Sequence, residues 1–179
     1  MCSTAQCKRI FRGGDHRKNK KENVLKCNEL VGGILRLIAS VQSLDEQVLE
    51  NVARTNISLE SISFFSDETS DTESHSYSEL ILGLPGDSRA GHLSGFKGLM
   101  DTGISLITQH QFALFPGIDL DSFEVRKKFG MITQFRPIQR CVGVYSFGED
   151  QFTSVETEEI CTGGTSLSFE DYIEMRRLF

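Results

Sequence analysis

Three short stretches of this 179-residue chain carry residue types at spacings that could do chemistry. The string LMDTG at positions 99–103 places a carboxylate next to a glycine that favours a turn. The string LKCNE at positions 25–29 sets a thiol between an apolar and an acidic side chain. Basic side chains crowd the first 26 residues. These stretches indicate three classes of function: acid–base catalysis, recognition by a protein partner, and binding of a polyanion.

The stretch at 99–105 resembles the active-site turn of the retropepsin-like aspartic proteases. In that family the aspartate sits in a tight turn after a strand, and two aspartates, one from each subunit, share a proton. By this resemblance Asp101 would be the catalytic acid/base, Thr102 and Gly103 would form its turn, and the enzyme would be a homodimer. The family's second motif has its nearest counterpart at residues 160–163, where Thr162 departs from the pattern. The alternative is an Asp-Gly surface turn.

The stretch at 25–29 resembles the L-x-C-x-E peptide by which several viral proteins engage the retinoblastoma pocket. That peptide binds extended, so Leu25, Cys27 and Glu29 would point the same way. An acidic phospho-acceptor tract often accompanies such motifs, and Ser70 with Glu73 suits an acidophilic kinase. The alternative is the start of an amphipathic helix, on which Cys27 would point elsewhere.

The charge of the chain is segregated. Residues 1–26 carry eight Lys/Arg and two acidic residues, whereas the rest carries 11 basic and 23 acidic residues. A basic N-terminal segment of this kind could contact nucleic acid, a nucleoprotein or an anionic membrane surface, or serve as a nuclear-import signal. The alternative is a solvated tail. The candidate polyanion-binding residues are Lys8, Arg9, Arg12, Arg17, Lys18, Lys20 and Lys21.

The cysteines and histidines indicate neither a metal site nor a disulfide framework. Five scattered cysteines, with no signal-peptide pattern before them, predict reduced thiols and a cytoplasmic or nuclear rather than secreted protein. Cys2, Cys7, His16 and Cys27 match no zinc-site spacing. We therefore expect no metal and no cofactor. The chain also has no apolar run long enough for a transmembrane helix.

Hydrophobic periodicity predicts the elements that must position these residues. Residues 1–21 read as a flexible basic arm, and residues 22–179 as a single domain. Apolar residues at spacings of three and four predict a helix over 22–54, or a helix pair broken near Gln42 with Ser43 and Glu46 as a capping box. Residues 57–65 alternate like a strand, and residues 66–78 read as an acidic Ser/Thr-rich loop.

Short apolar runs separated by Gly and Pro predict strands in the second half of the chain. They lie at 80–84, 104–107, 112–115, 131–135, 141–147 and 152–155. Residues 83–88 read as a turn rather than a phosphate-binding loop. Ser168 reads as the N-cap of a short closing helix, with Asp171 at the box position. The predicted fold class is therefore α+β: N-terminal helix or helix pair, mostly antiparallel β body, and C-terminal helix.

The function that best fits these patterns is that of a non-enzymatic intracellular interaction or assembly protein, such as a small viral matrix-type or accessory protein. The basic N-terminal segment, residues 1–21, would contact a polyanion, and the body would form a homo-oligomer or bind protein partners. Two alternatives remain open: an aspartic endopeptidase acting through Asp101, and an adaptor that binds a retinoblastoma-type pocket through residues 25–29.

Overall fold

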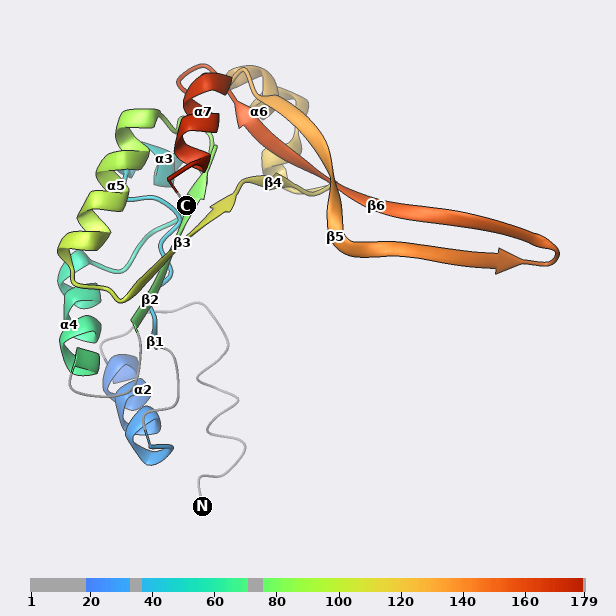
Figure 1. Cartoon of the computed structure of the whole chain (residues 1–179). Coiled ribbons are helices and arrows are strands. Elements are labelled where there is room, and N and C mark those ends of the chain that lie inside the picture. Colours follow the sequence, from blue (N-terminus) through green and yellow to red (C-terminus); the bar gives the residue numbers. More distant parts are fainter. Residues whose placement is uncertain (1–18, 33–36, 71–75, 179) are drawn as a thin grey trace.

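The computed structural model describes residues 19–32, 37–70 and 76–178 as a mixed α+β fold, as the sequence predicts (Figure 1). It contains a parallel sheet in the order β1-β2-β3 and an antiparallel sheet in the order β4-β6-β5. The elements are α2 (Asn19–Leu30), β1 (Leu37–Ile38), α3 (Glu46–Asn51), α4 (Leu59–Ser70), β2 (Ser76–Leu82), α5 (Arg89–Asp101), β3 (Leu106–Gln111), β4 (Ala113–Leu114), the 3-10 helix η1 (Asp119–Asp121), α6 (Phe123–Lys128), β5 (Ile132–Phe147), β6 (Asp150–Gly163) and α7 (Phe169–Arg176).

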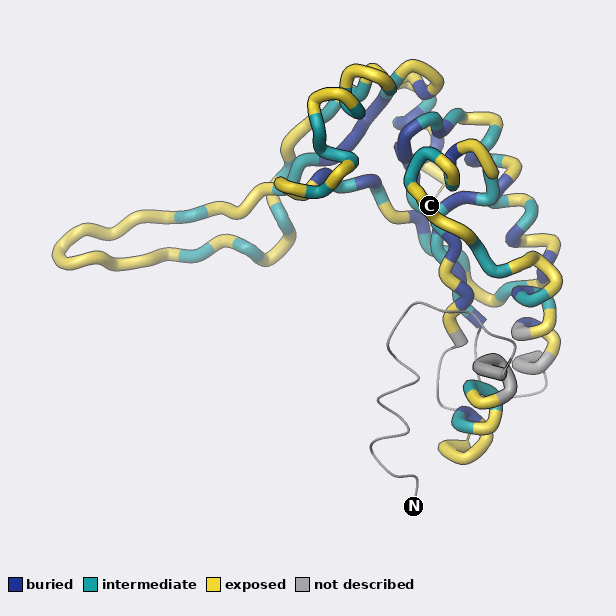
Figure 2. Tube along the Cα trace, turned by 180° about the vertical axis from the view of Figure 1, so that it is seen from behind, coloured by how far each residue is buried: buried dark blue, intermediate teal, exposed yellow. Residues whose placement is uncertain are grey.

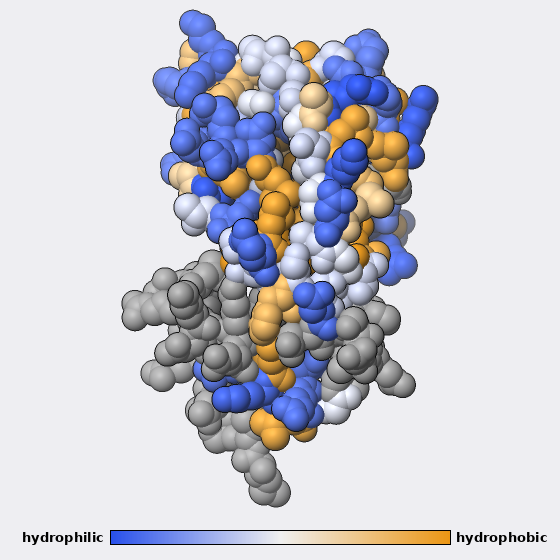
Figure 3. Space-filling model, turned by 90° about the vertical axis from the view of Figure 1, so that its left-hand side faces the viewer, coloured by the Kyte–Doolittle hydropathy of each residue, from blue (hydrophilic) through white to orange (hydrophobic). Residues whose placement is uncertain are grey.

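The parallel sheet has helices packed along one of its faces. Strand β2 pairs in parallel with both neighbours, and α5 connects β2 to β3 as a βαβ unit. Along β2 every second side chain, from Ser76 to Leu82, is buried. Leu80 joins a core cluster with Ile62 of α4 and Leu99 of α5. The outer surface of this helical side mixes polar and apolar residues (Figure 3).

The antiparallel sheet ends in a long projecting hairpin. Strands β5 and β6 pair from Ile132 opposite Gly163 out to Phe147 opposite Asp150, with a register shift between Pro137 and Val142. The inner part packs on the body through Cys161 and Leu114, which share a cluster with Val48 of α3. Beyond the register shift, residues 138–157 extend away from the body and are mostly exposed (Figure 2). We call residues 138–157 the arm.

The closing helix forms as its cap predicts. Ser168 Oγ accepts a hydrogen bond from the backbone N–H of Asp171 at 3.0 Å, which satisfies one of the unpaired donors at the start of α7. Tyr172 and Met175 of α7 are buried and pack against Leu82 of β2. Arg89 of α5 donates hydrogen bonds to both carboxylate oxygens of Glu174 of α7, at 2.7 and 2.8 Å.

Several sequence-based boundaries are wrong. The predicted helix over 22–54 is interrupted by β1, and α3 is capped by Asp45, whose Oδ1 accepts from the N–H groups of Gln47 and Val48, rather than by Ser43. The predicted strand over 57–65 is helix α4 instead. The predicted acidic loop over 66–78 begins inside α4 and ends inside β2, and residues 71–75 lie outside the described part. Among the described helices, none is long and apolar enough to span a membrane.

Candidate functional site

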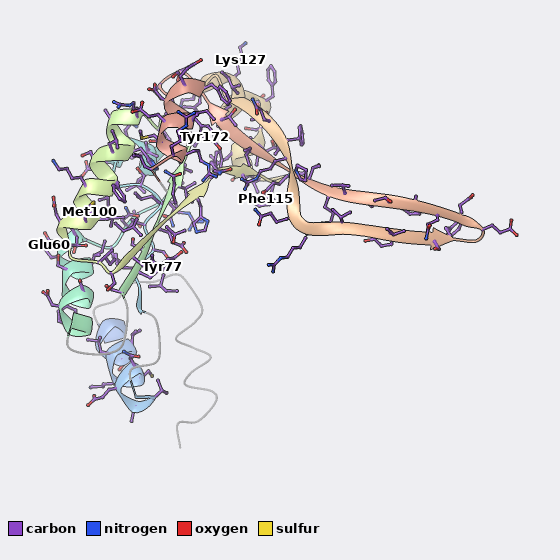
Figure 4. All side chains as sticks on the ribbon, viewed as in Figure 1. Glu60, Tyr77, Met100, Phe115, Lys127 and Tyr172 are labelled. Atoms are coloured by element: carbon purple, nitrogen blue, oxygen red, sulfur yellow. The ribbon has the colours of Figure 1, made fainter. Side chains whose placement is uncertain are left out.

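The face of the parallel sheet that points away from α4 and α5 is the candidate site. Strand pairing brings Tyr77 beside Leu106, Glu79 beside Thr108, and Ile81 beside His110. At the far edge, Ile38 pairs with Tyr77 and is 61% exposed. We call Ile38, Tyr77, Glu79, Leu106, Thr108 and His110 the open face. Figure 4 shows Tyr77 on this side of the sheet, with Met100 and Glu60 on the opposite, helical side.

A carboxylate lies near the middle of the open face with two titratable neighbours. Tyr77 Oη donates a hydrogen bond to Glu79 Oε1 at 2.7 Å. His110 Nε2 lies 3.6 Å from the same oxygen. The Glu79 side chain is 34% exposed and the His110 side chain 52% exposed, so solvent or a ligand can reach both. The three side chains come from two adjacent parallel strands, whose regular hydrogen bonding fixes their spacing.

The loop after β2 is held in a tight turn at the carboxyl end of the strand, as the sequence predicts for residues 83–88. Gly83 and Gly86 both have φ of +86°, a conformation that favours glycine. The Asp87 carboxylate, buried to 3% exposure, accepts hydrogen bonds from the backbone N–H groups of Gly83 at 3.0 Å and Ser88 at 2.8 Å. Ser88 Oγ then caps α5 by accepting from the Gly91 N–H. In open parallel sheets ligands bind beyond the carboxyl ends of the strands.

A buried polar network links this loop to the C-terminal helix. His92 Nδ1 lies 3.4 Å from Asp87 Oδ2, and its Nε2 lies 3.0 Å from Gln109 Nε2. Gln109 Nε2 also donates to the backbone carbonyl of Met175 at 3.3 Å. Because an imidazole that accepts from this amide at Nε2 carries its proton on Nδ1, that proton points at Asp87. The network therefore holds the loop, α5, β3 and α7 in one arrangement.

The hollow beside this loop is small. Residues 83–87 and 163–167 line it, together with Phe129, Met131 and Cys161. Its volume of about 10 Å³ is roughly that needed by one water molecule. This hollow is therefore too small for an organic ligand.

The structure places the protease-like string at the end of a helix rather than after a strand. Asp101 is the last residue of α5, exposed to solvent, and Thr102 is its C-cap. Thr102 Oγ1 donates to the Leu99 carbonyl at 2.6 Å, and Gly103 has φ of +75°. This is an ordinary helix C-terminus, in which glycine adopts the left-handed conformation. The expected strand–turn geometry of a catalytic aspartate is not found here.

The recognition string at 25–29 lies within helix α2. Leu25, Cys27 and Glu29 are therefore not extended, and the arrangement that a pocket-binding peptide needs is not found. Ser70 is the last residue of α4. Of the candidate polyanion-binding residues, Lys20 and Lys21 fall in the first turn of α2. Lys8, Arg9, Arg12, Arg17 and Lys18 lie outside the described residues, so their role stays a prediction.

No metal-binding cluster of three or more His, Cys, Asp or Glu side chains occurs among the residues that the structure describes. Cys161 is buried, and its Sγ–H donates to the Gly163 carbonyl at 3.3 Å. Burial raises the pKa of this thiol above its ordinary value, which keeps it protonated. Cys161 is therefore a residue of the hydrophobic core rather than a metal ligand.

The residues of the open face were not identified from the sequence. His110 lies between the predicted strands at 104–107 and 112–115, but it belongs to β3. The available signal was the alternation in SYSELIL at 76–82, where Tyr77 and Glu79 occupy the less buried positions. That alternation finds the face of one strand, but not which strand lies next to it.

The chain matches no protein-family profile, but it resembles two curated methyltransferases over 95 residues. It is 33% identical to 2-(S-pantetheinyl)-carbapenam-3-carboxylate methyltransferase of Streptantibioticus cattleyicolor. It is 30% identical to the cobalamin-dependent radical SAM methyltransferase TokK of Streptomyces tokunonensis. Each match covers 52% of this chain but only 14% of the relative. The chain thus spans about one seventh of the length of these relatives.

The shared region includes the end of this loop and the start of α5. A continuous stretch covering 52% of 179 residues is about 93 residues long and leaves at most 86 on either side. Residues 87–93 consequently lie within it wherever it begins. These residues include Asp87, Ser88 and His92, which shape the turn from β2 into α5.

Proposed function

We propose that this chain forms part of a methyltransferase related to the two relatives, and that its open face contributes to binding S-adenosylmethionine. Two observations support the proposal. The resemblance to the methyltransferases includes residues 87–93, where the turn that follows β2 leads into α5. The same strand carries Glu79 on the open face, hydrogen-bonded by Tyr77 and close to His110.

The chemistry of the open face suits a cationic ligand that also carries hydroxyl groups. S-adenosylmethionine has a positively charged sulfonium and an ammonium group. A carboxylate attracts such a cation most strongly where solvent is partly excluded, and an adjacent aromatic ring adds a cation–π contact. The hydrogen bond from Tyr77 fixes one oxygen of Glu79 and so orients the carboxylate. His110 and Thr108 add polar groups that can bond to hydroxyls.

The hollow beside the loop does not fit cobalamin, the second cofactor that the name of TokK implies. Cobalamin carries its own cobalt in a large corrin ring, whereas this hollow accommodates about one water molecule. We therefore derive no step through cobalamin from these residues.

Equilibrium binding tests the proposal. Titration of the chain with S-adenosylmethionine should show saturable binding by calorimetry, and Glu79→Gln should weaken it about tenfold, which corresponds to about 1.4 kcal/mol. S-adenosylhomocysteine, which lacks the sulfonium charge, should bind more weakly than S-adenosylmethionine. Glu124→Gln, at an exposed carboxylate of α6, is the matched control and should leave the affinity unchanged. No binding, or equal affinity in the Glu79 variant, would overturn the proposal.

A second proposal is the interaction and assembly function that the sequence indicates. The observation that favours it is the arm, which presents apolar side chains to solvent instead of packing on the body. Phe147, near the arm's tip, is 82% exposed. The polyanion contact assigned to residues 1–21 stays part of this proposal. Deletion of residues 1–21 should abolish salt-sensitive binding to RNA or anionic liposomes, and unchanged binding would count against it.

A further inference from the structure

Both strand edges of the arm lack a third strand among the residues that the structure describes. Strands β5 and β6 pair with each other from Val142 opposite Val155 to Phe147 opposite Asp150, and β4 meets β6 only at the root of the hairpin. An unpaired edge presents a row of backbone N–H and C=O groups with which a further strand can pair. A two-stranded hairpin is marginally stable in water, and three or more strands are needed for independent stability. The arm is therefore a candidate for strand addition.

The two edges of the arm differ in charge. From Cys141 to Phe147, β5 contains no charged residue and no proline. The facing segment of β6 carries Asp150 and Glu156. Proteins protect exposed edges against pairing by placing charged residues and proline on them, so β6 has such protection and β5 does not. The edge suited to accept a further strand is therefore that of β5.

The regular part of this edge is short and has a defined centre. It is bounded by Arg140, with φ of +65°, and by Gly148, with φ of +63°. A positive φ interrupts the extended conformation, so a further strand can pair only with the seven residues between these two positions. The middle residue of the seven is Val144, which is 62% exposed.

The same seven residues of a second copy form a matching strand. Two identical strands that pair antiparallel are related by a two-fold axis, which closes the assembly at two copies. With the axis at Val144, this residue lies opposite its own counterpart, and Gly143 lies opposite Tyr145. Val142 lies opposite Ser146. This pairing places no charge in the seam between the two β5 strands.

The aromatic side chains of the arm lie on one face of the hairpin and would join across this seam. Tyr145 pairs with Phe152, their rings stack with centroids 5.7 Å apart, and Phe147 shares their face two residues further along β5. The Tyr145 ring also covers Gly143 of its own strand, where an added Cβ would lie 2.6 Å from ring carbon Cε2. An aromatic ring over a strand glycine is a recurrent way to stabilise a sheet. Pairing of two copies would therefore unite two aromatic faces into one.

We propose that two copies of this chain associate through the β5 edges of their arms, in a four-stranded antiparallel sheet of order β6-β5-β5-β6. The seam would contain about seven main-chain hydrogen bonds. Asp150 and Glu156 lie on the outer strands of this sheet and oppose addition of further copies. Each arm extends away from its body, so the two bodies lie at opposite ends of the paired arms (Figure 1). The pairing gives a partner to the assembly function proposed above and rests on that proposal.

Sedimentation equilibrium of the full chain at low ionic strength, from about 1 μM to about 1 mM, tests the association. The expected result is a monomer–dimer equilibrium. Val144→Lys should weaken the dimer about fivefold, because the two-fold axis sets the two ammonium groups directly opposite each other. An equimolar mixture of Val144→Lys and Val144→Glu chains should restore the dimer, because opposite charges then face each other.

Thr153→Lys is the matched control. Thr153 pairs with Val144 across the hairpin and is exposed, so it shares the same face and the same distance along the arm. It lies on β6, one strand further from the two-fold axis, and its substitution should leave the dimer nearly unchanged. Circular dichroism of each variant checks that the body remains folded.

Three results would overturn the pairing. A chain that stays monomeric throughout would overturn the assembly proposal as well. A dimer that Thr153→Lys weakens as much as Val144→Lys does would mean that the arms meet through their faces. A dimer that Val144→Lys leaves unchanged, or that the mixture fails to restore, would mean that another surface assembles. The last two results leave the assembly proposal standing, and none of the three bears on S-adenosylmethionine, whose binding the Glu79 variant tests.

Discussion

Arg126 of α6 donates hydrogen bonds to both carboxylate oxygens of Glu159 on β6, with two N–O distances of 2.7 Å. The same guanidinium bonds to Asp121, and Thr133 of β5 donates to Glu159 as well. This cluster ties η1 and α6 to the root of the hairpin. A bidentate pair that is partly shielded from water is among the stronger ion pairs that proteins form. The charged form of Glu159 therefore helps to hold the root of the hairpin against η1 and α6.

Stability should fall in acid because of this pair. Hydrogen bonds from Arg126 and Thr133 lower the pKa of Glu159 from 4.5 to about 2. A carboxylate whose pKa is lower in the folded state stabilises the protein above its unfolded pKa, and this contribution is lost as the pH falls from about 4.5 toward 2. Glu159→Gln should cost about 2 kcal/mol at pH 7 and flatten that part of the pH profile. Urea unfolding at several pH values measures it, with Glu124→Gln as control. An unchanged profile would show that the pair contributes nothing.

Asp87 and Asp101 should respond oppositely to the same substitution. Asp87→Asn places an amide where the buried carboxylate accepts from Gly83, Ser88 and His92, so at least one N–H loses its partner, which costs about 1–3 kcal/mol. Asp101 is exposed at the C-terminus of α5, where a negative charge opposes the helix dipole. Asp101→Asn should therefore be neutral or slightly stabilising. Chemical denaturation compares the two, and a large loss for Asp101→Asn would mean that this carboxylate has a role that its geometry does not reveal.

The elements that the sequence predicts carry local signals. Helix α7 begins at the Ser168 cap, and the strand predicted over 80–84 overlaps the last three residues of β2. Helix α5 was missed because Gly91, Gly95 and Gly98 lower its helix propensity by about 1 kcal/mol each. Close packing explains why glycine occupies two of these positions. A Cβ on Gly98 would lie 3.0 Å from Leu44 Cδ1, and one on Gly95 would contact Leu44 and Leu80. The close approach of Leu44 and Leu80 to these glycines is a tertiary contact, which cannot be read from the local sequence.

The wrong prediction of a helix over 22–54 and the failure to predict the open face share a cause, which is pairing between strands distant in sequence. Apolar residues spaced by three and four on both sides of β1 imitate one helical stripe, although Ile38 pairs with Tyr77 of a distant strand. Glu79 and His110 are 31 positions apart and meet only because β2 and β3 are neighbours in parallel register. Local patterns identify single faces of elements. They cannot supply the pairing that assembles a site from two strands.

The cysteines should differ sharply in reactivity. Cys161 is 3% exposed and its pKa is raised by burial, so little thiolate is present and little reagent reaches it. Cys141 is half-buried on the arm. Alkylation of the native protein followed by peptide mass spectrometry should modify Cys141 well before Cys161, and denaturant should abolish the difference. Equal rates in the native protein would mean that the hairpin root opens readily.

Gly83 and Gly117 form a matched pair for testing the loop after β2. Both have strongly positive φ, +86° and +88°, so an alanine at either position costs about 1 kcal/mol in backbone strain. At Gly83 the added Cβ would also lie 2.9 Å from the Cys161 backbone carbonyl oxygen, whereas nothing lies within 4 Å at Gly117. A backbone atom of a paired strand cannot move aside as the end of a side chain can. Gly83→Ala should therefore lower the unfolding free energy by about 2 kcal/mol more than Gly117→Ala. Equal losses in urea titrations would mean that β2 and β6 do not approach each other this closely.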